Sequence, residues 1–311
     1  MRALPNRVLF ALLTVYIVWG STYFAIRIAL ESFAPFWLMG SRFLVAGAVL
    51  FVWLKWRGAP SPSWRQWRDG AAVGVLLLGG GMGMVAVAEQ YVSSGMTAVF
   101  IASSPLMFAV WGGLFGDWPT RLQWVGIAAG FMGALLLASG SEFSANPAGV
   151  LALIGAISCW TLGSVLSQKK LKLAPGAMGF ASEMLAGGIF LTIAAWLSGE
   201  DFSAPLSGNA LLSWLYLITA GSLVAFSAYM YLLSKVPHAL ASSYAYVNPV
   251  IAVILGSLFG GEAIGLREAV AMTIILGSVI LLMRAKSDPS AGQRPQTNAE
   301  STDNITSKGT A

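Results

Sequence analysis

The feature that most constrains this chain is a series of apolar runs, each about 20 residues long. A helix of about 20 apolar residues crosses the hydrocarbon core of a bilayer. Only 10% of the 311 residues are charged and 57% are hydrophobic, whereas a soluble domain has about 25% charged residues. The sequence therefore predicts an all-α membrane protein with ten transmembrane helices, at residues 8–29, 35–54, 70–90, 96–116, 121–139, 147–167, 176–197, 211–233, 239–259 and 265–283.

The basic residues orient these helices. A net charge of +5 would suggest a nucleic-acid partner if the protein were soluble. If the N-terminus is cytoplasmic, however, most Lys and Arg residues fall on the cytoplasmic side, as the positive-inside rule requires. These residues are Arg2, Arg7, Lys55, Arg57, Arg65, Arg68, Arg121, Lys169, Lys170, Lys172, Lys235, Arg284, Lys286, Arg294 and Lys308. We therefore expect a multi-pass protein of a bacterial-type inner (cell) membrane with both termini in the cytoplasm, lipid as its surroundings and no nucleic-acid partner.

Two rare residue types limit the chemistry. The only cysteine is Cys159 and the only histidine is His238, so a metal site or an internal disulfide has too few ligands. We expect no metal, no cofactor and no catalytic residue. Residues 284–311 are polar and contain no aromatic side chain, which is typical of a disordered tail.

The chain repeats itself at an offset of roughly 141 to 144 positions. The matches are Trp19 with Trp160, Ser41 with Ser182, Arg42 with Glu183, Gly47 with Gly188, Pro105 with Pro249, and residues 114–116 with 258–260. Because each half has five predicted helices, the second half enters the membrane from the opposite side. The sequence thus predicts two inverted-topology repeats, at residues 8–140 and 147–283, followed by the tail at 284–311.

Two stretches within this repeat resemble a known family. They are AEQYVSSGMTAVFIASSPLMFAVWGGLFG at 88–116 and HALASSYAYVNPVIAVILGSLFGGE at 238–262. Both resemble the EamA-domain signature of the drug/metabolite transporter (DMT) superfamily, and YIVWGSTYFAIRIALES at 16–32 resembles its YedA-type branch. Asp117 departs from the pattern, since the family usually has Glu there, as at Glu262. The resemblance implies ten helices, a pseudo-two-fold axis in the membrane plane, a central cavity and export of small metabolites or drugs.

Charged residues within the predicted helices are the first candidates for transport, because each is costly in lipid. Arg42 and Glu183 occupy equivalent positions of the two halves with opposite sign. Two readings are open: a structural pair or two snorkelling groups at opposite faces, and a functional role as a substrate carboxylate site at Arg42 or a protonatable group at Glu183. Glu89 lies near the outer end of its helix. Two roles fit this position: a gate residue and a site of proton coupling.

Some predicted helices carry polar and aromatic side chains that would face lipid if the helices were not packed around a space. These side chains therefore indicate a central cavity. For each of them alone, a role in helix packing is also open. The full set of substrate-binding or coupling candidates is Trp19, Tyr23, Arg42, Glu89, Phe100, Ser104, Trp160, Glu183, Tyr229, Tyr244 and Asn248. Pro105 and Pro249 are expected to bend the helices that contain them.

The leading hypothesis is a secondary exporter of small, amphipathic, amino-acid-like metabolites that works by alternating access. Arg42 would bind the carboxylate of the substrate, and the aromatic residues would pack on its apolar part. The second choice of substrate is a cationic drug, held by the aromatic residues and Glu183. Protons are a candidate coupling ion, and monomer and homodimer both remain open. The alternatives are a polytopic membrane enzyme, which replacement of His238 would inactivate, and a channel, which would show no saturable, trans-stimulated flux.

Overall fold

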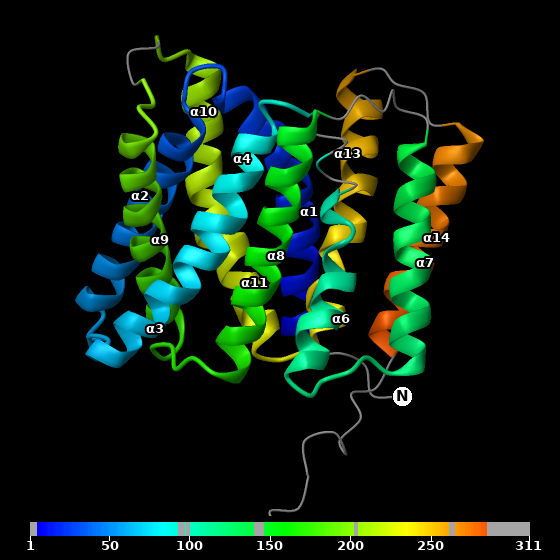
Figure 1. Ribbon diagram of the computed structural model, residues 1–311, viewed down its shortest axis with the longest axis horizontal. Coiled ribbons are helices and arrows are strands. Elements are labelled where there is room, and N and C mark those ends of the chain that lie inside the picture. Colours follow the sequence, from blue (N-terminus) through cyan, green and yellow to red (C-terminus); the bar gives the residue numbers. More distant parts are fainter. Residues whose placement is uncertain are drawn as a thin grey trace, which may run out of the picture.

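The computed structural model describes residues 5–92, 97, 100–139, 146–201, 205–260 and 265–284. These ranges contain helices and no strand, which confirms the all-α class (Figure 1). The elements are α1 (Asn6–Ala29), α2 (Pro35–Trp56), α3 (Trp64–Gly74), η1 (Val75–Gly83), α4 (Met84–Ala88), α6 (Ser104–Leu114), α7 (Arg121–Ala138), α8 (Pro147–Lys169), α9 (Ala177–Leu197), α10 (Gly208–Tyr216), η2 (Leu217–Val224), α11 (Ala225–Leu233), α12 (His238–Ala241), α13 (Tyr244–Gly260) and α14 (Leu266–Arg284).

Within the described residues, six helices are long and apolar enough to cross a membrane. They are Asn6–Ala29, Pro35–Trp56, Trp64–Ala88, Pro147–Lys169, Ala177–Leu197 and Gly208–Leu233. Shorter apolar helices occupy Ser104–Leu114, Arg121–Leu136 and Ala269–Arg284. The predicted tail, which follows Arg284, lies outside the described residues. Arg2, Glu142 and Glu262 also lie outside them.

Local signals fix several helix starts. Pro35 and Pro147 stand in the first turns of α2 and α8, where a missing backbone N–H breaks no internal hydrogen bond. Thr120 begins α7 with a capping box, in which its hydroxyl accepts from the Gln123 N–H and the Gln123 side chain accepts from the Thr120 N–H. The sequence alone thus places these boundaries to within about a turn.

The predicted helices at 96–116 and 239–259 are where expectation and structure differ. Pro105 lies in the first turn of α6 and not inside a continuous helix. Instead of the expected bend at Pro105, the helix is interrupted just before this residue. The second stretch is divided into α12 and α13 at Ser242–Ser243. There the Ser243 hydroxyl donates to the Leu240 carbonyl at 2.7 Å, a local bond that competes with helix continuation. Pro249 does lie inside α13.

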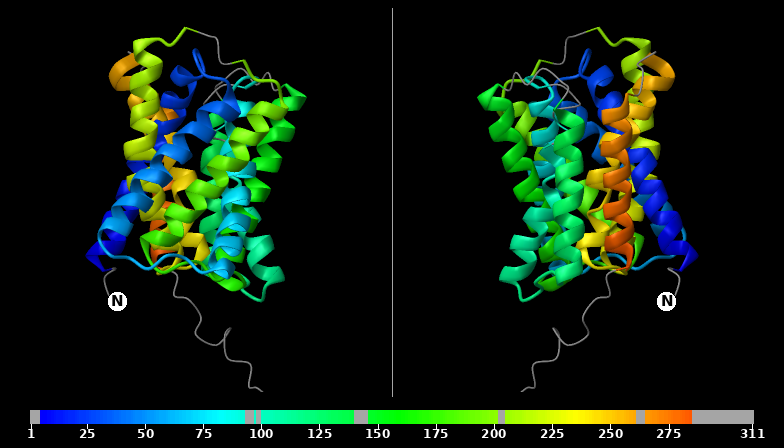
Figure 2. Two further views of the ribbon diagram at one scale, coloured as in Figure 1. Left: turned by 90° about the vertical axis from the view of Figure 1, so that its left-hand side faces the viewer. Right: turned by 90° about the vertical axis from the view of Figure 1, so that its right-hand side faces the viewer.

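The connectors sort into two faces at opposite ends of the helices (Figures 1 and 2). The turns after α2, α6, α8 and α11 lie at the lower face of Figure 1, together with the start of α1. The turns after α1 and α9 lie at the upper face. The lower face, which we call the basic face, carries Lys55, Arg57, Arg65, Arg68, Arg121, Lys169, Lys170, Lys172 and Lys235.

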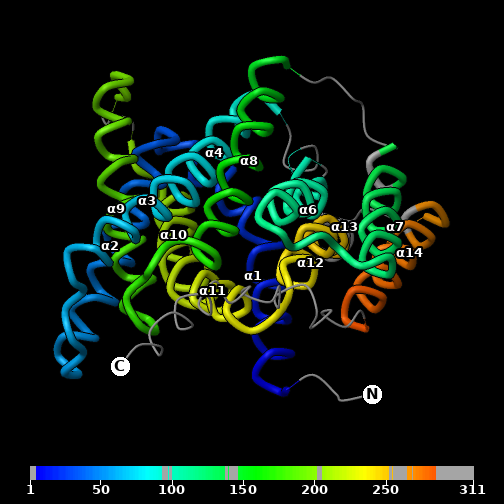
Figure 3. The backbone as a smooth tube through the Cα atoms, turned by 60° about the horizontal axis from the view of Figure 1, so that its bottom comes forward, coloured from blue at the N-terminus to red at the C-terminus, as the bar shows by residue number. Residues whose placement is uncertain are grey.

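Helix α1 runs through the middle of the bundle (Figure 3). It packs against α10, η2, α11 and α13, all of which come from the second half of the chain. On one side α2 packs against α9, and on the other α7 packs against α14. Small residues allow these close approaches: a methyl group on Gly47 would lie 2.9 Å from the Leu185 backbone nitrogen.

Two of the long helices contain a π-helical segment near their centres, η1 and η2. Their first residues, Val75 and Leu217, are 142 positions apart, an offset within the range found in the sequence. A π-helical turn is wider than an α-helical one and is frequently found at functional sites. These segments border the site described next.

Candidate functional site

Four aromatic rings from four helices meet in the core of the bundle. Trp19 of α1 lies 5.4 Å from Trp160 of α8, 5.0 Å from Tyr229 of α11 and 4.9 Å from Tyr244 of α13, measured between ring centroids. The pairs with Trp160 and Tyr244 are edge-to-face, an arrangement that aromatic quadrupoles favour. We call these four residues the aromatic cluster. All four were predicted as site residues, and the structure brings them together.

Hydrogen bonds fix the orientation of these rings. The Trp160 indole N–H donates to the Tyr229 hydroxyl at 3.1 Å, and that hydroxyl lies 2.9 Å from the Ser164 hydroxyl. The Trp19 indole N–H donates to the carbonyl of Gly221, which belongs to η2. The polar atoms of buried Trp and Tyr residues need such partners, so the cluster is positioned by packing and by hydrogen bonds together.

The two tryptophans each lie against a π-helical segment. The Trp160 ring is so close to Gly81 of η1 that a methyl group there would lie 3.0 Å from it. Trp19 reaches Gly221 of η2 in the corresponding way. Each tryptophan therefore contacts the glycine-containing segment whose wide turn leaves room for the ring.

A small pocket lies beside the aromatic cluster. Its volume is about 40 Å³, room for roughly three water molecules. Ser104 of α6 and Tyr23 of α1, both predicted site residues, line this pocket. Its complete lining is Trp19, Thr22, Tyr23, Gly81, Met82, Val85, Ile101, Ser104, Ala156, Ile157, Trp160 and Tyr244. In this conformation the rings pack on one another and nearly close the space.

Arg42 is buried behind Thr22. Its Nε donates to the Ser222 hydroxyl at 2.8 Å, and its guanidinium carbon lies 4.9 Å from the centre of the Phe43 ring. A methyl group on Gly221 would lie 2.8 Å from Arg42 Nη2 and 3.2 Å from the Thr22 methyl. Within the described chain, no carboxylate forms an ion pair with Arg42. Among the described residues, this fully buried guanidinium thus has no anionic partner, and it lies against Gly221 next to Thr22, which lines the pocket.

Glu183 does not pair with Arg42. Both carboxylate oxygens of Glu183 are buried and lack a hydrogen-bond partner among the residues that the structure describes. The residue lies on α9, in the part of the bundle where α9 packs against α2 and α3. Of the two readings of this residue pair, a direct structural pair is therefore the one that the geometry does not support.

The predicted residues nearer the upper face lie above the cluster. The Asn248 amide donates to the Tyr23 hydroxyl at 3.4 Å. Both carboxylate oxygens of Glu89 are buried and without a hydrogen-bond partner. Phe100 packs at the edge of the core and does not line the pocket. Tyr23 and Asn248 therefore join the site, Glu89 lies beside it, and Phe100 is a packing residue.

Sequence reasoning missed the hydroxyls that tie the site together. Tyr16, which precedes Trp19 by about one turn of α1, and Ser243 are joined by a 2.6 Å hydrogen bond. Ser164 and Ser222 hold Tyr229 and Arg42 respectively. Helical spacing gives a signal for two of them: Tyr16 shares a face with Trp19 and Tyr23, and Ser222 shares a face with Tyr229. Nothing in the sequence marks Ser164 or Ser243 as facing inward.

The family model described as the EamA-like transporter family matches residues 6–139 and again residues 147–284. The chain is 46% identical over 278 residues to the uncharacterized inner membrane transporter YedA of Escherichia coli K12, a match that covers 89% of this chain and 90% of the relative. It is 27% identical to an uncharacterized transporter of Archaeoglobus fulgidus, covering 85% of this chain and 93% of that protein. A crystal structure of a protein 19% identical has the same fold, with a TM-score of 0.73 over 89% of this chain and 96% of the other.

Proposed function

The chain belongs to the EamA-like transporter family of the drug/metabolite transporter superfamily, and from this premise we propose that it is a secondary exporter working by alternating access at the aromatic cluster. Its substrates are small amphipathic metabolites that resemble amino acids, and drugs of similar size are the second choice. The protein lies in the bacterial inner membrane, as the name of the Escherichia coli relative states for that protein.

The architecture we propose has ten membrane-crossing helices in two inverted five-helix repeats. The double match of the family model supports this division. So does the equivalence of the two halves around the site, where Trp19 contacts η2 and Trp160 contacts η1. Exchanging the conformations of two such halves would open one central site alternately to each side of the membrane.

The basic face is the cytoplasmic face in this proposal. Lys and Arg residues in short connectors favour the cytoplasm, and nine of them lie in or beside the turns of that face. Both chain termini are then cytoplasmic. An export cycle begins with the pocket open to the basic face and ends with it open to the upper face.

The observation that carries the proposed substrate class is the aromatic cluster with Arg42 behind it. Four rings provide apolar, polarisable walls, and the polar groups of three of them, Trp19, Trp160 and Tyr229, are already paired. The guanidinium without a carboxylate partner would attract a substrate carboxylate through the Thr22 side of the pocket. Because only about 40 Å³ is free, the rings have to separate as the substrate binds, which couples binding to helix movement.

Transport can be tested in liposomes containing the purified full-length chain. We expect radiolabelled L-leucine to enter vesicles preloaded with unlabelled leucine in a saturable way, and faster than it enters empty vesicles. Trp19→Ala should abolish this exchange, whereas Trp56→Ala, a matched change at a residue that is 81% exposed, should leave it intact. Flux that rises linearly with concentration would indicate a channel instead, and exchange unaffected by Trp19→Ala would refute the site.

The two charged candidates separate the substrate classes. Arg42→Ala should raise the KM for leucine strongly and leave the transport of a cation such as tetraphenylphosphonium unchanged. Glu183→Gln and Glu89→Gln test proton coupling, since one of them should remove the dependence of leucine flux on an imposed pH gradient. If Arg42→Ala does not change leucine transport while Glu183→Gln stops cation transport, the cationic drug is the better substrate class.

A further inference from the structure

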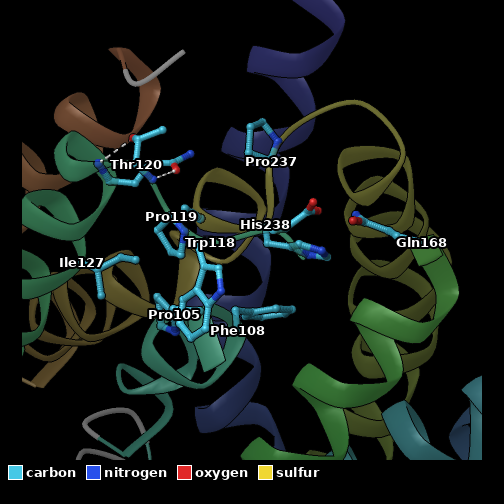
Figure 4. A pocket seen from close by; sticks show the side chains of 13 residues that line it. Pro105, Phe108, Trp118, Pro119, Thr120, Ile127, Gln168, Pro237 and His238 are labelled. Carbon is cyan, nitrogen blue, oxygen red and sulfur yellow. Dashed lines mark hydrogen bonds between the residues drawn. The ribbon is translucent and has the colours of Figure 1, made fainter. Parts of the chain in front are cut away.

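A second and larger pocket opens beside the basic face (Figure 4). Its volume is about 200 Å³, against about 40 Å³ for the pocket at the aromatic cluster. Its walls come from α6, the turn between α6 and α7, the end of α8 and the start of α12, so both halves of the chain contribute. Of these two pockets, it is therefore the one with room for a small molecule.

The walls of this pocket are partly polar and partly apolar. The polar residues are Asp117, Thr120, Gln123, Gln168 and His238. Phe108, Trp118 and Ile127 line it together with three prolines, Pro105, Pro119 and Pro237 (Figure 4). Such rigid side chains lose little conformational freedom when a ligand packs on them. An aliphatic side chain of a ligand would find apolar contacts on several sides.

His238 is a buried polar group in this wall. Its ring stacks on Phe108 with a centroid distance of 5.5 Å, and neither ring nitrogen has a hydrogen-bond partner. Burial lowers the pKa of His238 to about 4, more than the neighbouring Asp117 raises it. At neutral pH the ring is uncharged, so it offers one N–H donor and one acceptor that no protein group uses.

Asp117, which lines this pocket, forms an ion pair that joins the two halves of the chain. Lys169 Nζ, at the end of α8, lies 2.5 Å from Asp117 Oδ2, in the turn after α6. The two side chains are 31% and 40% exposed, and ion pairs exposed to this degree contribute little to stability. A ligand that carries a positive and a negative charge can pair with Asp117 through the first and with Lys169 through the second. Each side chain then exchanges one partner of opposite charge for another, and no charge is left unpaired.

The two pockets lie in series along α6 and the α12–α13 segment. Ser104 of α6 lines the pocket at the cluster, and Phe108, one helical turn further toward the basic face, lines the larger pocket. On the facing segment, Tyr244 lines the former and Ala239 the latter. A molecule bound in the larger pocket is therefore next to the aromatic cluster and on the side that the proposed function assigns to the cytoplasm.

We propose that this pocket is a loading site for zwitterionic α-amino acids with an apolar side chain. The ligand ammonium group binds Asp117, its carboxylate binds Lys169, and its side chain packs on Phe108 and the prolines. Opening the Asp117–Lys169 pair by this exchange releases the link between the turn after α6 and the end of α8. The inference rests on the proposed function only for its orientation and for the step that follows loading.

The single histidine of the chain makes this site observable without a transport assay. The full-length protein, labelled on histidine and held in lipid nanodiscs, gives imidazole NMR signals from His238 alone. L-Leucine should shift these signals saturably. Leucine amide, which lacks the carboxylate charge, and N-acetyl-leucine, which lacks the ammonium charge, should each bind at least tenfold more weakly. An equal response to leucine and either analogue, or no response to leucine, would overturn the proposal.

Variants separate this site from the aromatic cluster. Asp117→Asn and Lys169→Met should each weaken the leucine-induced shift at least tenfold, and the exchanged pair Asp117→Lys with Lys169→Asp should restore it. Lys170→Met, at the neighbouring exposed lysine, is the matched control. Trp19→Ala should keep the shift while it abolishes exchange in liposomes. If Trp19→Ala removes the shift, leucine is sensed from the cluster and the loading site is wrong. A normal shift in a wild-type chain that shows no leucine exchange would refute the proposed function and leave the loading site standing.

Discussion

The close contact between α3 and α9 predicts a large effect from a single methyl group. A Cβ added at Gly74 would lie 2.3 Å from the carbonyl oxygen of Glu183 and 3.1 Å from the backbone nitrogen of Gly187. Both atoms belong to the backbone of α9 and cannot rotate away. Gly74→Ala should therefore force the two helices apart, whereas a clash with a flexible side chain would be relieved locally.

The size of the effect follows from these distances. An ordinary contact of a Cβ atom begins at 3.4 Å, so the axes of α3 and α9 must separate by about 1 Å at this point. A gap of about 0.5–1 Å already loses a quarter to a half of the dispersion energy of the atoms beside it, and overpacking of a core costs about 1–3 kcal/mol. At about 2–4 °C per kcal/mol, we expect the unfolding midpoint to fall by about 2–12 °C.

Gly155→Ala on α8 is the matched control, because the nearest atom to its added methyl group is Met84 Cε at 3.8 Å, an ordinary contact. Both substitutions place Ala for Gly inside a helix and gain the same helix propensity, up to about 1 kcal/mol, so their difference isolates the steric term. The measurement is thermal unfolding of the purified protein in one detergent at one heating rate. Midpoints for the two variants within about 1 °C of each other would refute the reasoning.

Three further predictions concern the site and the upper face. Gly221→Ala places a methyl group 2.8 Å from Arg42 Nη2; the guanidinium can move, so the protein should fold normally but show about a tenfold higher KM for leucine, equivalent to about 1.4 kcal/mol. Tyr229→Phe removes the acceptor of the Trp160 indole N–H and should cost about 1–3 kcal/mol, seen as a lower unfolding midpoint. Glu200→Gln should cost about 0.5–2 kcal/mol, and less at high salt, because the Glu200 carboxylate accepts from the first free N–H groups of α2, those of Phe36 and Trp37, at 2.9 and 2.8 Å.

Each of these changes has a control of the same kind elsewhere in the chain. Gly277→Ala meets nothing within 4 Å and should leave the KM unchanged. Tyr91→Phe, at a side chain that is 48% exposed, should not move the midpoint. Glu31→Gln, at an exposed carboxylate, should have no salt-dependent effect. If a control variant matches its partner variant, the contact named for that partner does not explain the result.

Much of the fold follows from the sequence because lipid imposes one simple requirement. Every backbone polar group in the bilayer must be paired within its own segment, so long apolar runs have to be helices. Pro35, Pro147 and the Thr120 capping box then mark where helices begin. The family resemblance rests on short sequence motifs, and the orientation rests on basic residues in the connectors. Both are local patterns, so a single sequence is enough to recognise them.

Side-chain partners across the bundle are not local in this way. The sequence placed Trp19, Trp160, Tyr229 and Tyr244 among the site residues, because aromatic side chains on a helix stripe need a common environment. It equally suggested a pair of Arg42 and Glu183, but Arg42 bonds to Ser222 and Glu183 is left without a partner. The repeat gives two residues equivalent positions; it does not give their distance.

The sequence by itself determined that this protein is a helical membrane protein that resembles a transporter family, which ends of its helices carry the positive charge, and which aromatic residues are candidates for its site. Only the tertiary structure decided that four of those rings touch, that the Asp117–Lys169 pair joins the two halves, and that the larger pocket lies around His238. The physical reason is the range of the interactions. Hydropathy and charge act through the length of one segment, whereas ring contacts, hydrogen bonds and ion pairs depend on separations of a few ångströms between helices far apart in the chain.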